Sequence, residues 1–93
     1  MRTEVSNAPE RSRYELFLDG ELVGVADYRI VGDRVVMPHT EITPPLRGRG
    51  LGEILVGHAL DDVRATGRTV VPSCWFVAEY IDAHPDYRDL LAS

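Results

Sequence analysis

The chain has 93 residues, which is enough for one small domain and too little for two. Its ten basic residues are all Arg and are outnumbered by 15 acidic residues, so the net charge of −5 disfavours a nucleic-acid partner. The absence of Lys excludes a Walker-type phosphate loop and Schiff-base catalysis by a side-chain amine. One cysteine, Cys74, excludes an internal disulfide and a cysteine-rich zinc site, and it fits a cytoplasmic location. We see no secretory signal and no apolar run that would span a membrane, so no membrane partner is expected.

The first half of the chain predicts a small antiparallel sheet. Residues 1–12 are polar and aperiodic, so we expect a flexible N-terminal arm ahead of a single domain over residues 13–93. Asp19-Gly20 and Gly32-Asp33 are two-residue turn signals, and they separate three β-rich runs. These runs predict an antiparallel three-stranded meander with strands at 13–18, 21–30 and 34–42.

The second half changes to a helical pattern. Pro44-Pro45 ends the third strand because proline cannot donate to a ladder, and a glycine-rich loop follows. Gly67 is well placed as the C-terminal cap of the first helix. In chain order we expect a helix at 51–66, a fourth strand at 69–71, a helix at 73–83 and a last turn at 87–91. The chain as a whole is therefore predicted to be a mixed α/β (α+β) domain.

The loop Arg47-Gly48-Arg49-Gly50-Leu51-Gly52 is the most informative segment, because it lies between a strand and an amphipathic helix. A helix start carries free N–H groups and a partial positive charge, and glycines let an anion approach the backbone. A dinucleotide fingerprint is excluded because Glu53 stands where its third glycine would be. The plainer alternative is a glycine-rich turn with two solvated arginines.

The spacing R-x-x-G-x-G, made by Arg47, Gly50 and Gly52, resembles the pyrophosphate-binding motif of the GNAT acetyltransferase superfamily. The run from Val71 to Tyr87 and the segment His39-Thr40-Glu41 resemble the small, single-domain, YjdJ-like N-acetyltransferases. This resemblance covers nearly the whole chain. It implies a minimal GNAT fold and acetyl-coenzyme A as cosubstrate, with no metal.

The resemblance also implies where coenzyme A would bind. Pantetheine would lie between the third and fourth strands where they splay apart, and backbone N–H groups of the loop would hold the pyrophosphate. Arg47 and Arg49 would add charge-assisted contacts. The implied coenzyme-binding residues are Ile42, Thr43, Arg47, Gly48, Arg49, Gly50, Leu51 and Gly52.

Four residues are candidates for catalysis. The resemblance implies that Tyr80 is a general acid for the departing thiolate, and the alternative is a core tyrosine. Cys74 lies near a helix N-terminus, so it is a nucleophile, a wall of the acetyl pocket or a small apolar filler. His39 and Glu41 share one strand face, so they form either a base for the incoming ammonium or a surface pair.

Together these features predict an acetyl-CoA-dependent N-acetyltransferase with an amine acceptor that the sequence does not identify. A backbone N–H of the third strand would polarise the thioester carbonyl. The alternatives are a non-catalytic coenzyme A-binding module and a small structural protein. Trp75 departs from the family pattern, in which we expect a smaller residue, and could reshape the acceptor pocket or the pantetheine channel.

Overall fold

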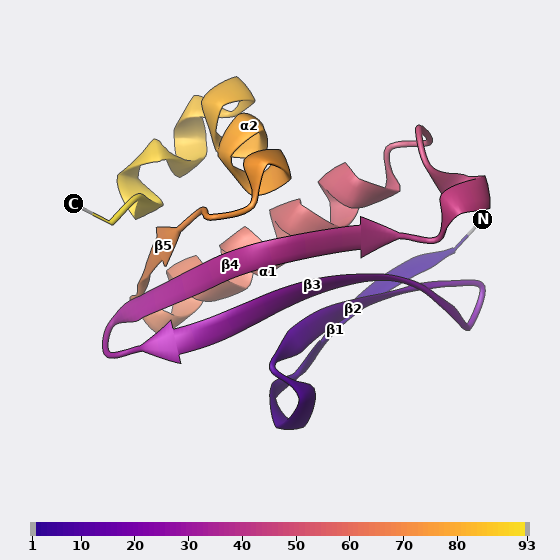
Figure 1. Cartoon of the computed structure of the whole chain (residues 1–93), viewed down its shortest axis with the longest axis horizontal. Coiled ribbons are helices and arrows are strands. Elements are labelled where there is room, and N and C mark those ends of the chain that lie inside the picture. Colours follow the sequence, from indigo (N-terminus) through magenta and orange to yellow (C-terminus); the bar gives the residue numbers. More distant parts are fainter. Residues whose placement is uncertain (1, 93) are drawn as a thin grey trace.

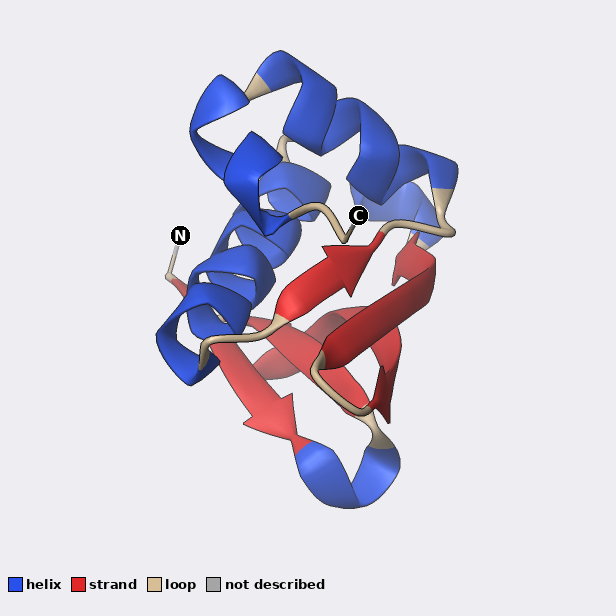
Figure 2. Ribbon diagram, turned by 90° about the vertical axis from the view of Figure 1, so that its left-hand side faces the viewer, coloured by secondary structure: helices blue, strands red, loops and turns tan. Residues whose placement is uncertain are grey.

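A single five-stranded sheet forms the centre of the computed structural model, which describes residues 2–92. The strands lie in chain order, antiparallel from β1 to β4, and β5 joins β4 in parallel. They are β1 (Thr3–Ala8), β2 (Arg13–Leu18), β3 (Glu21–Val31), β4 (Arg34–Ile42) and β5 (Thr69–Val71). The long helix α1 (Leu51–Thr66) and the shorter α2 (Trp75–Ala83) gather on one face of this sheet (Figures 1 and 2). The predicted mixed α/β class is therefore confirmed.

The N-terminal segment differs from the prediction. The expected flexible arm is wrong for residues 3–12, which form β1 and a 3-10 turn at Pro9–Arg11. β1 pairs with β2 along its whole length, and the Tyr28 hydroxyl donates to Asn7 Oδ1 at 2.7 Å. An edge strand with one face in solvent needs few apolar residues, and here they are too sparse to produce a visible period. Residue 1 lies outside the described part of the chain.

The predicted meander is confirmed over β2, β3 and β4, with β3 one residue longer than expected. The first hairpin has the geometry that Asp19-Gly20 predicts, because both residues adopt positive φ, 51° and 86°. This turn places β2 and β3 in a fixed register, so that the apolar side chains of the two strands reach the same face.

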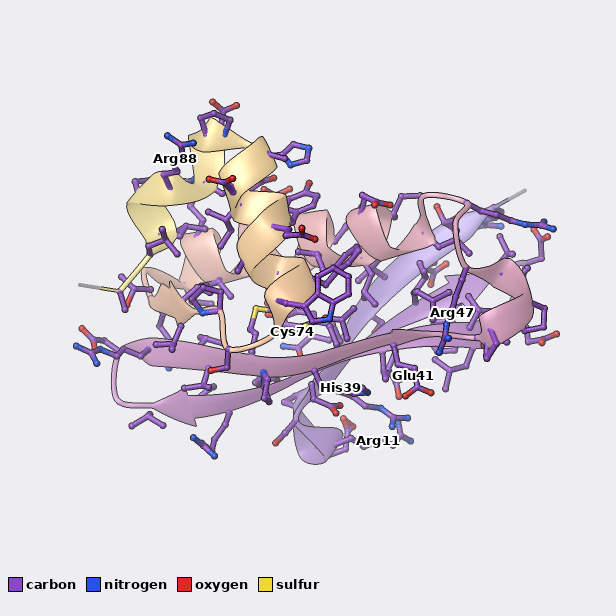
Figure 3. The ribbon with its side chains drawn as sticks, turned by 45° about the horizontal axis from the view of Figure 1, so that its top comes forward. Arg11, His39, Glu41, Arg47, Cys74 and Arg88 are labelled. Carbon is purple, nitrogen blue, oxygen red and sulfur yellow. The ribbon has the colours of Figure 1, made fainter. Side chains whose placement is uncertain are left out.

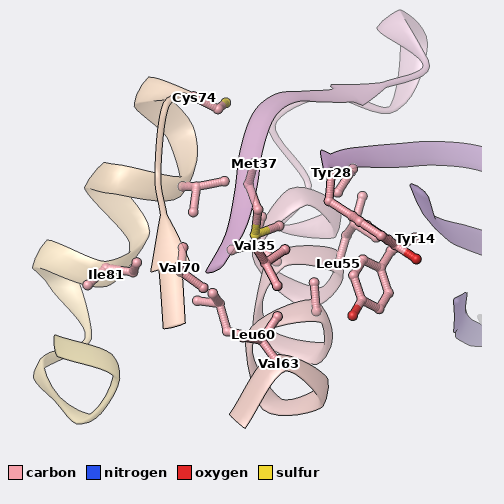
Figure 4. Close-up of a cluster of buried hydrophobic side chains, with 14 of the residues drawn as sticks. Tyr14, Tyr28, Val35, Met37, Leu55, Leu60, Val63, Val70, Cys74 and Ile81 are labelled. Atoms are coloured by element: carbon pink, nitrogen blue, oxygen red, sulfur yellow. The ribbon is translucent and has the colours of Figure 1, made fainter. Parts of the chain in front are cut away.

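Helix α1 covers the sheet with its apolar face, and its predicted bounds are confirmed. Gly67 ends it in the left-handed conformation at φ 77°, as its position predicted. Leu55 and Leu60 of α1 and Met37 of β4 are completely buried between helix and sheet (Figure 4). No helix within residues 2–92 is both long and apolar enough to cross a membrane.

Two glycines let α2 approach α1 closely. A Cβ atom at Gly52 would lie 2.8 Å from the ring of Phe76, and one at Gly57 would lie 2.7 Å from the Tyr80 hydroxyl. Real Cβ contacts are longer than this, so a larger residue at either position would force the ring of Phe76 or Tyr80 to shift. Helix α2 is thereby held beside the first turn of α1, where the glycine-rich loop ends.

A 3-10 segment, η3 (Pro85–Leu90), follows α2 and is fastened to α1. Arg64 makes two hydrogen bonds to the carboxylate of Asp89, and the Tyr87 hydroxyl donates to Asp61 Oδ1 at 2.7 Å. These contacts fix the chain that follows α2, so α2 is supported on both sides.

Candidate functional site: a cleft where two strands part

The central feature of the site is the separation of β4 from β5. Within residues 2–92, β5 pairs with β4 only along Arg34–Val36, and the last backbone contact is the Cys74 N–H to the Met37 carbonyl at 2.9 Å. Beyond this point β4 runs on to Ile42 while the other chain segment turns into α2 (Figure 1). The gap is a cleft of about 1060 Å³.

Four segments line the cleft: the end of β4, the glycine-rich loop, the first turn of α1 and the start of α2. The lining residues are Pro38, His39, Thr40, Glu41, Ile42, Leu46, Arg47, Gly48, Gly50, Leu51, Gly52, Glu53, Ser73, Cys74, Trp75 and Phe76. The cleft thus joins the segments that the sequence singled out.

The end of β4 presents unpaired backbone to the cleft. The Thr43 N–H donates to the Val23 carbonyl, and this bond shows which residue pairs between β3 and β4 are the hydrogen-bonded ones. Since bonded residues alternate in an antiparallel pair, His39 and Glu41 direct their backbone groups to β3. The backbone groups of Thr40 and Ile42 therefore point the other way, into the cleft.

A β-bulge decides which side chains accompany that backbone. Asp27 pairs with His39 and Arg29 with Val36, so β4 has one more residue than β3 across this interval. The extra residue shifts the alternation of β4 side chains between the two faces of the sheet. As a result Ile42 packs against the core, whereas His39 and Glu41 are exposed on the sheet face away from α1.

The glycine-rich loop ends in an uncapped helix start. Gly48 and Gly50 both adopt φ 80°, and within residues 2–92 the N-cap position of α1, Gly50, has no side-chain cap. The helical bonds begin with the Ile54 N–H to the Gly50 carbonyl, so the N–H groups of Leu51, Gly52 and Glu53 precede the ladder. Such donors, with the positive end of the helix dipole, suit an anion.

The two arginines of the loop are not equivalent. Arg47 lines the cleft and donates from Nε to the Ile42 carbonyl at 3.1 Å, whereas Arg49 is exposed and lies outside the lining. Thr43 is also outside it. The six other predicted coenzyme-binding residues line the cleft: Ile42, Arg47, Gly48, Gly50, Leu51 and Gly52.

His39 and Glu41 form the pair that their spacing predicted. Nε2 of His39 lies 3.1 Å from Oε1 of Glu41, and both side chains are exposed on one side of β4 (Figure 3). A carboxylate beside an imidazole can accept a proton directly or through water. Across residues 2–92, no group of three His, Cys, Asp or Glu is placed to hold a metal ion.

Cys74 lies at the closed end of the cleft, where the two strands part. It is 9% exposed, it is the N-cap residue of α2, and its Sγ lies 3.8 Å from Thr40 Oγ1. This position fits the wall of a pocket for a small acyl group. The neighbouring Thr40 hydroxyl is not a base that would activate the thiol.

Tyr80 is the catalytic candidate that the structure does not bring to the cleft. Its hydroxyl lies over Gly57 of α1, and its ring stacks on His84 with centroids 4.0 Å apart. Burial, together with the nearby Asp61 charge, raises the pKa of the Tyr80 hydroxyl. Its role as a general acid stays a prediction, and the geometry gives it a packing role between the helices.

Three cleft residues are not evident as site residues from the sequence. The helical period places Phe76 only in the apolar set of its helix, yet its ring lies over Gly52 at the helix start. Thr40 faces Cys74 across the closed end. Glu53 brings a carboxylate to the first turn of α1, and its place in the glycine-rich motif is the signal that could have found it.

The chain matches the family described as GCN5-related N-acetyl-transferase over residues 13–90. Protein NATD1 of Gallus gallus is 36% identical to it over 59 residues, which are 62% of this chain and 54% of that protein. The chain thus spans about half the length of the curated relatives it matches.

Two solved structures share the fold. A GCN5-like protein from Staphylococcus aureus has a TM-score of 0.73 at 18% identity, covering 97% of this chain and 88% of that one. N-acetylglutamate synthase from Neisseria gonorrhoeae, complexed with coenzyme A and N-acetyl-glutamate, has a TM-score of 0.60 at 20% identity. The match covers 94% of this chain and 26% of the synthase.

Proposed function

The chain belongs to the GCN5-related N-acetyltransferase family, and we propose that it is an acyltransferase that moves an acetyl group from acetyl-coenzyme A to an amine. The predicted GNAT resemblance is confirmed by the family match over residues 13–90. Assignment to the YjdJ-like subgroup stays a prediction.

The observation that carries the proposal is the parting of β4 and β5 beside an uncapped, glycine-lined helix start. In this arrangement the pyrophosphate binds the N–H groups of Leu51, Gly52 and Glu53, with Arg47 at its side. Pantetheine amides pair with the backbone of Thr40 and Ile42. The complex of the Neisseria synthase with coenzyme A supports this choice of donor.

The thioester then lies at the closed end of the cleft, between β4 and Cys74. Pro38 has no N–H, so the Thr40 N–H is the first backbone donor beyond the point where the strands part, and it polarises the thioester carbonyl. The cleft thus offers a donor for developing negative charge without any cationic side chain at the reacting atom.

The reaction balances with the groups that border the cleft and with solvent. An incoming ammonium gives one proton to the Glu41–His39 pair, directly or through water. The neutral amine attacks the thioester carbonyl carbon, a C–N bond forms, and the C–S bond breaks. The thiolate of coenzyme A leaves and takes up a proton from solvent, while the amide nitrogen loses its remaining extra proton.

The test of this proposal is a calorimetric titration with acetyl-coenzyme A, using the two loop arginines as a matched pair. Arg47→Gln should weaken binding about tenfold because Arg47 lines the cleft, whereas Arg49→Gln should change it less than about threefold. No binding by folded wild-type protein would overturn the proposal. Equal losses in the two variants would show that the pyrophosphate does not bind beside Arg47 at the start of α1.

A further inference from the structure

Trp75 is the most exposed large apolar side chain within residues 2–92, at 71% exposure. It is the first residue of α2, it directly follows Cys74, and it lines the cleft. Its ring lies at 77° to that of Phe76, with centroids 5.9 Å apart. Because the residue is 71% exposed, at least one face of the indole is accessible. The lip of the cleft on the α2 side is therefore a large aromatic surface.

The opposite lip, on β4, carries a carboxylate, that of Glu41. Glu41 lies beside His39, and Asp27 is the direct partner of His39 on β3. Arg11 lies on the same side (Figure 3) and binds Glu15 at 3.1 Å. Arg13 binds Glu15 at 2.7 Å and is also the direct partner of Asp27 on β3. Glu41 of β4 and Trp75 of α2 therefore line the same cleft from two different elements.

The two ends of the cleft differ in the charge that they favour. The end at the start of α1 has helix N–H donors and Arg47, which suit the anionic coenzyme. His39 and Glu41 line the cleft from the sheet face that points away from α1. A second substrate can reach the thioester from this face without crossing the coenzyme.

We propose that Trp75 selects the acceptor, and that the acceptor is a primary alkylammonium held between the Trp75 ring and the Glu41 carboxylate. Tryptophan attracts a cation over its face more strongly than the other aromatic residues, and a carboxylate adds charge and takes the proton that must leave. The ammonium belongs either to a free diamine or to a lysine side chain of a peptide. This inference rests on the proposed function.

The experiment measures release of the coenzyme A thiol, with kcat and KM for three probes. They are 1,4-diaminobutane, a peptide with one lysine and a blocked N-terminus, and aniline as an uncharged amine. In Trp75→Ala, the KM for the better charged probe should rise about three- to tenfold, because an accessible cation–π contact is lost. Trp75→Phe should recover part of that loss. The Kd of acetyl-coenzyme A, measured separately, should stay within about twofold.

Val31→Ala is the matched control, since Val31 is an exposed apolar residue outside the cleft, and its acceptor KM should equal that of the wild type. A rise in the Kd of acetyl-coenzyme A without a rise in acceptor KM would overturn the inference and place Trp75 in the coenzyme channel. Preference of the wild type for aniline, or turnover of none of the probes by protein that binds acetyl-coenzyme A, would also overturn it. Absence of acetyl-coenzyme A binding would instead reject the proposed function itself. The better charged probe identifies the source of the ammonium.

Discussion

The two halves of β4 have opposite surroundings. Along Arg34–Val36 the strand has β3 on one side and β5 on the other, and Met37, the next residue, is completely buried under α1. Along residues 38–42 the second neighbour is gone, and the strand borders a cleft. The same strand is therefore a structural element at one end and the wall of a substrate site at the other.

This contrast shows how little a small domain needs to create a site. The closed half of β4, residues 34–37, contributes to the packing that stabilises the fold. The open half, residues 38–42, can therefore leave backbone groups unpaired for a ligand. A change in the closed half should therefore affect stability, and a change in the open half should affect binding.

The largest expected effect comes from the closed half. Met37→Ala should lower the free energy of unfolding by about 2–5 kcal/mol, because it leaves a cavity under α1. Thr40→Ala, three residues further along, should lower it by less than about 1 kcal/mol. Urea unfolding measures both.

Met37→Leu provides a milder variant in case the alanine variant does not fold. It should lower the free energy of unfolding by less than about 1.5 kcal/mol. If Thr40→Ala proves as destabilising as Met37→Ala, the division of β4 into a structural half and a binding half is wrong.

The second prediction uses two glycines of α1 that both touch an aromatic residue of α2. Gly52→Ala and Gly57→Ala should each lower stability by up to about 2 kcal/mol, since overpacking is partly offset by the better helix propensity of alanine. Only Gly52→Ala should weaken acetyl-coenzyme A binding, by about tenfold or more, because Phe76 then moves into the cleft. Calorimetry alongside thermal unfolding separates the two effects. Equal loss of affinity in both variants would contradict the assignment.

Glu53 should produce a smaller effect of opposite sign. Its carboxylate lies 3.7 Å from the position of a Cβ atom at Gly50, close to where the pyrophosphate is proposed to bind. Glu53→Gln should tighten acetyl-coenzyme A binding about two- to fivefold at low salt, and less at high salt because the charge is exposed. Glu79→Gln, an exposed acid of α2 outside the cleft, is the control and should change nothing. Weaker binding by Glu53→Gln would place the pyrophosphate elsewhere.

The smallest expected effect concerns the hydrogen bond between Tyr87 and Asp61 that fastens η3 to α1. The hydrogen bond to Asp61, with some burial, raises the pKa of Tyr87 to about 12. Since the unfolded side chain titrates near 10, its contribution to stability is complete below about pH 10 and is lost as the pH rises through about 12. The free energy of unfolding, measured with urea between pH 9 and 12, should therefore fall less steeply with pH in Tyr87→Phe than in the wild type. Tyr14, whose pKa burial also raises, keeps part of the decline in both proteins. Identical slopes would show that the Asp61 bond does not hold η3 in solution.

The sequence predicted most elements because their signals are local. Asp19-Gly20 defines a hairpin and Gly67 a helix end wherever they occur, and the apolar period of residues 51–66 needs no tertiary context. Strand β1 was missed because its partner, and not its own pattern, makes it a strand.

The site was predictable where chemistry depends on the backbone, as in the loop from Arg47 to Gly52. It was not predictable where a side chain must point in one direction. Tyr80 and Phe76 both lie on the inner side of α2, four residues apart, and the helical period alone cannot say which one reaches the cleft. That depends on how far α2 extends past the start of α1, which is a tertiary distance.

The bulge at residues 36–39 has a consequence for how this strand must be read. In a regular strand, the alternation that buries Val35 and Met37 would also bury His39 and Glu41. The extra residue of the bulge shifts this alternation, so both side chains lie on the exposed face. If β4 kept all its residues but formed a regular strand without the bulge, His39 and Glu41 would be buried under α1 and Ile42 would be exposed to solvent. The chemistry of this domain is therefore encoded by a residue count as much as by residue identity, and a one-residue length change near Pro38 is a different kind of mutation from any substitution there.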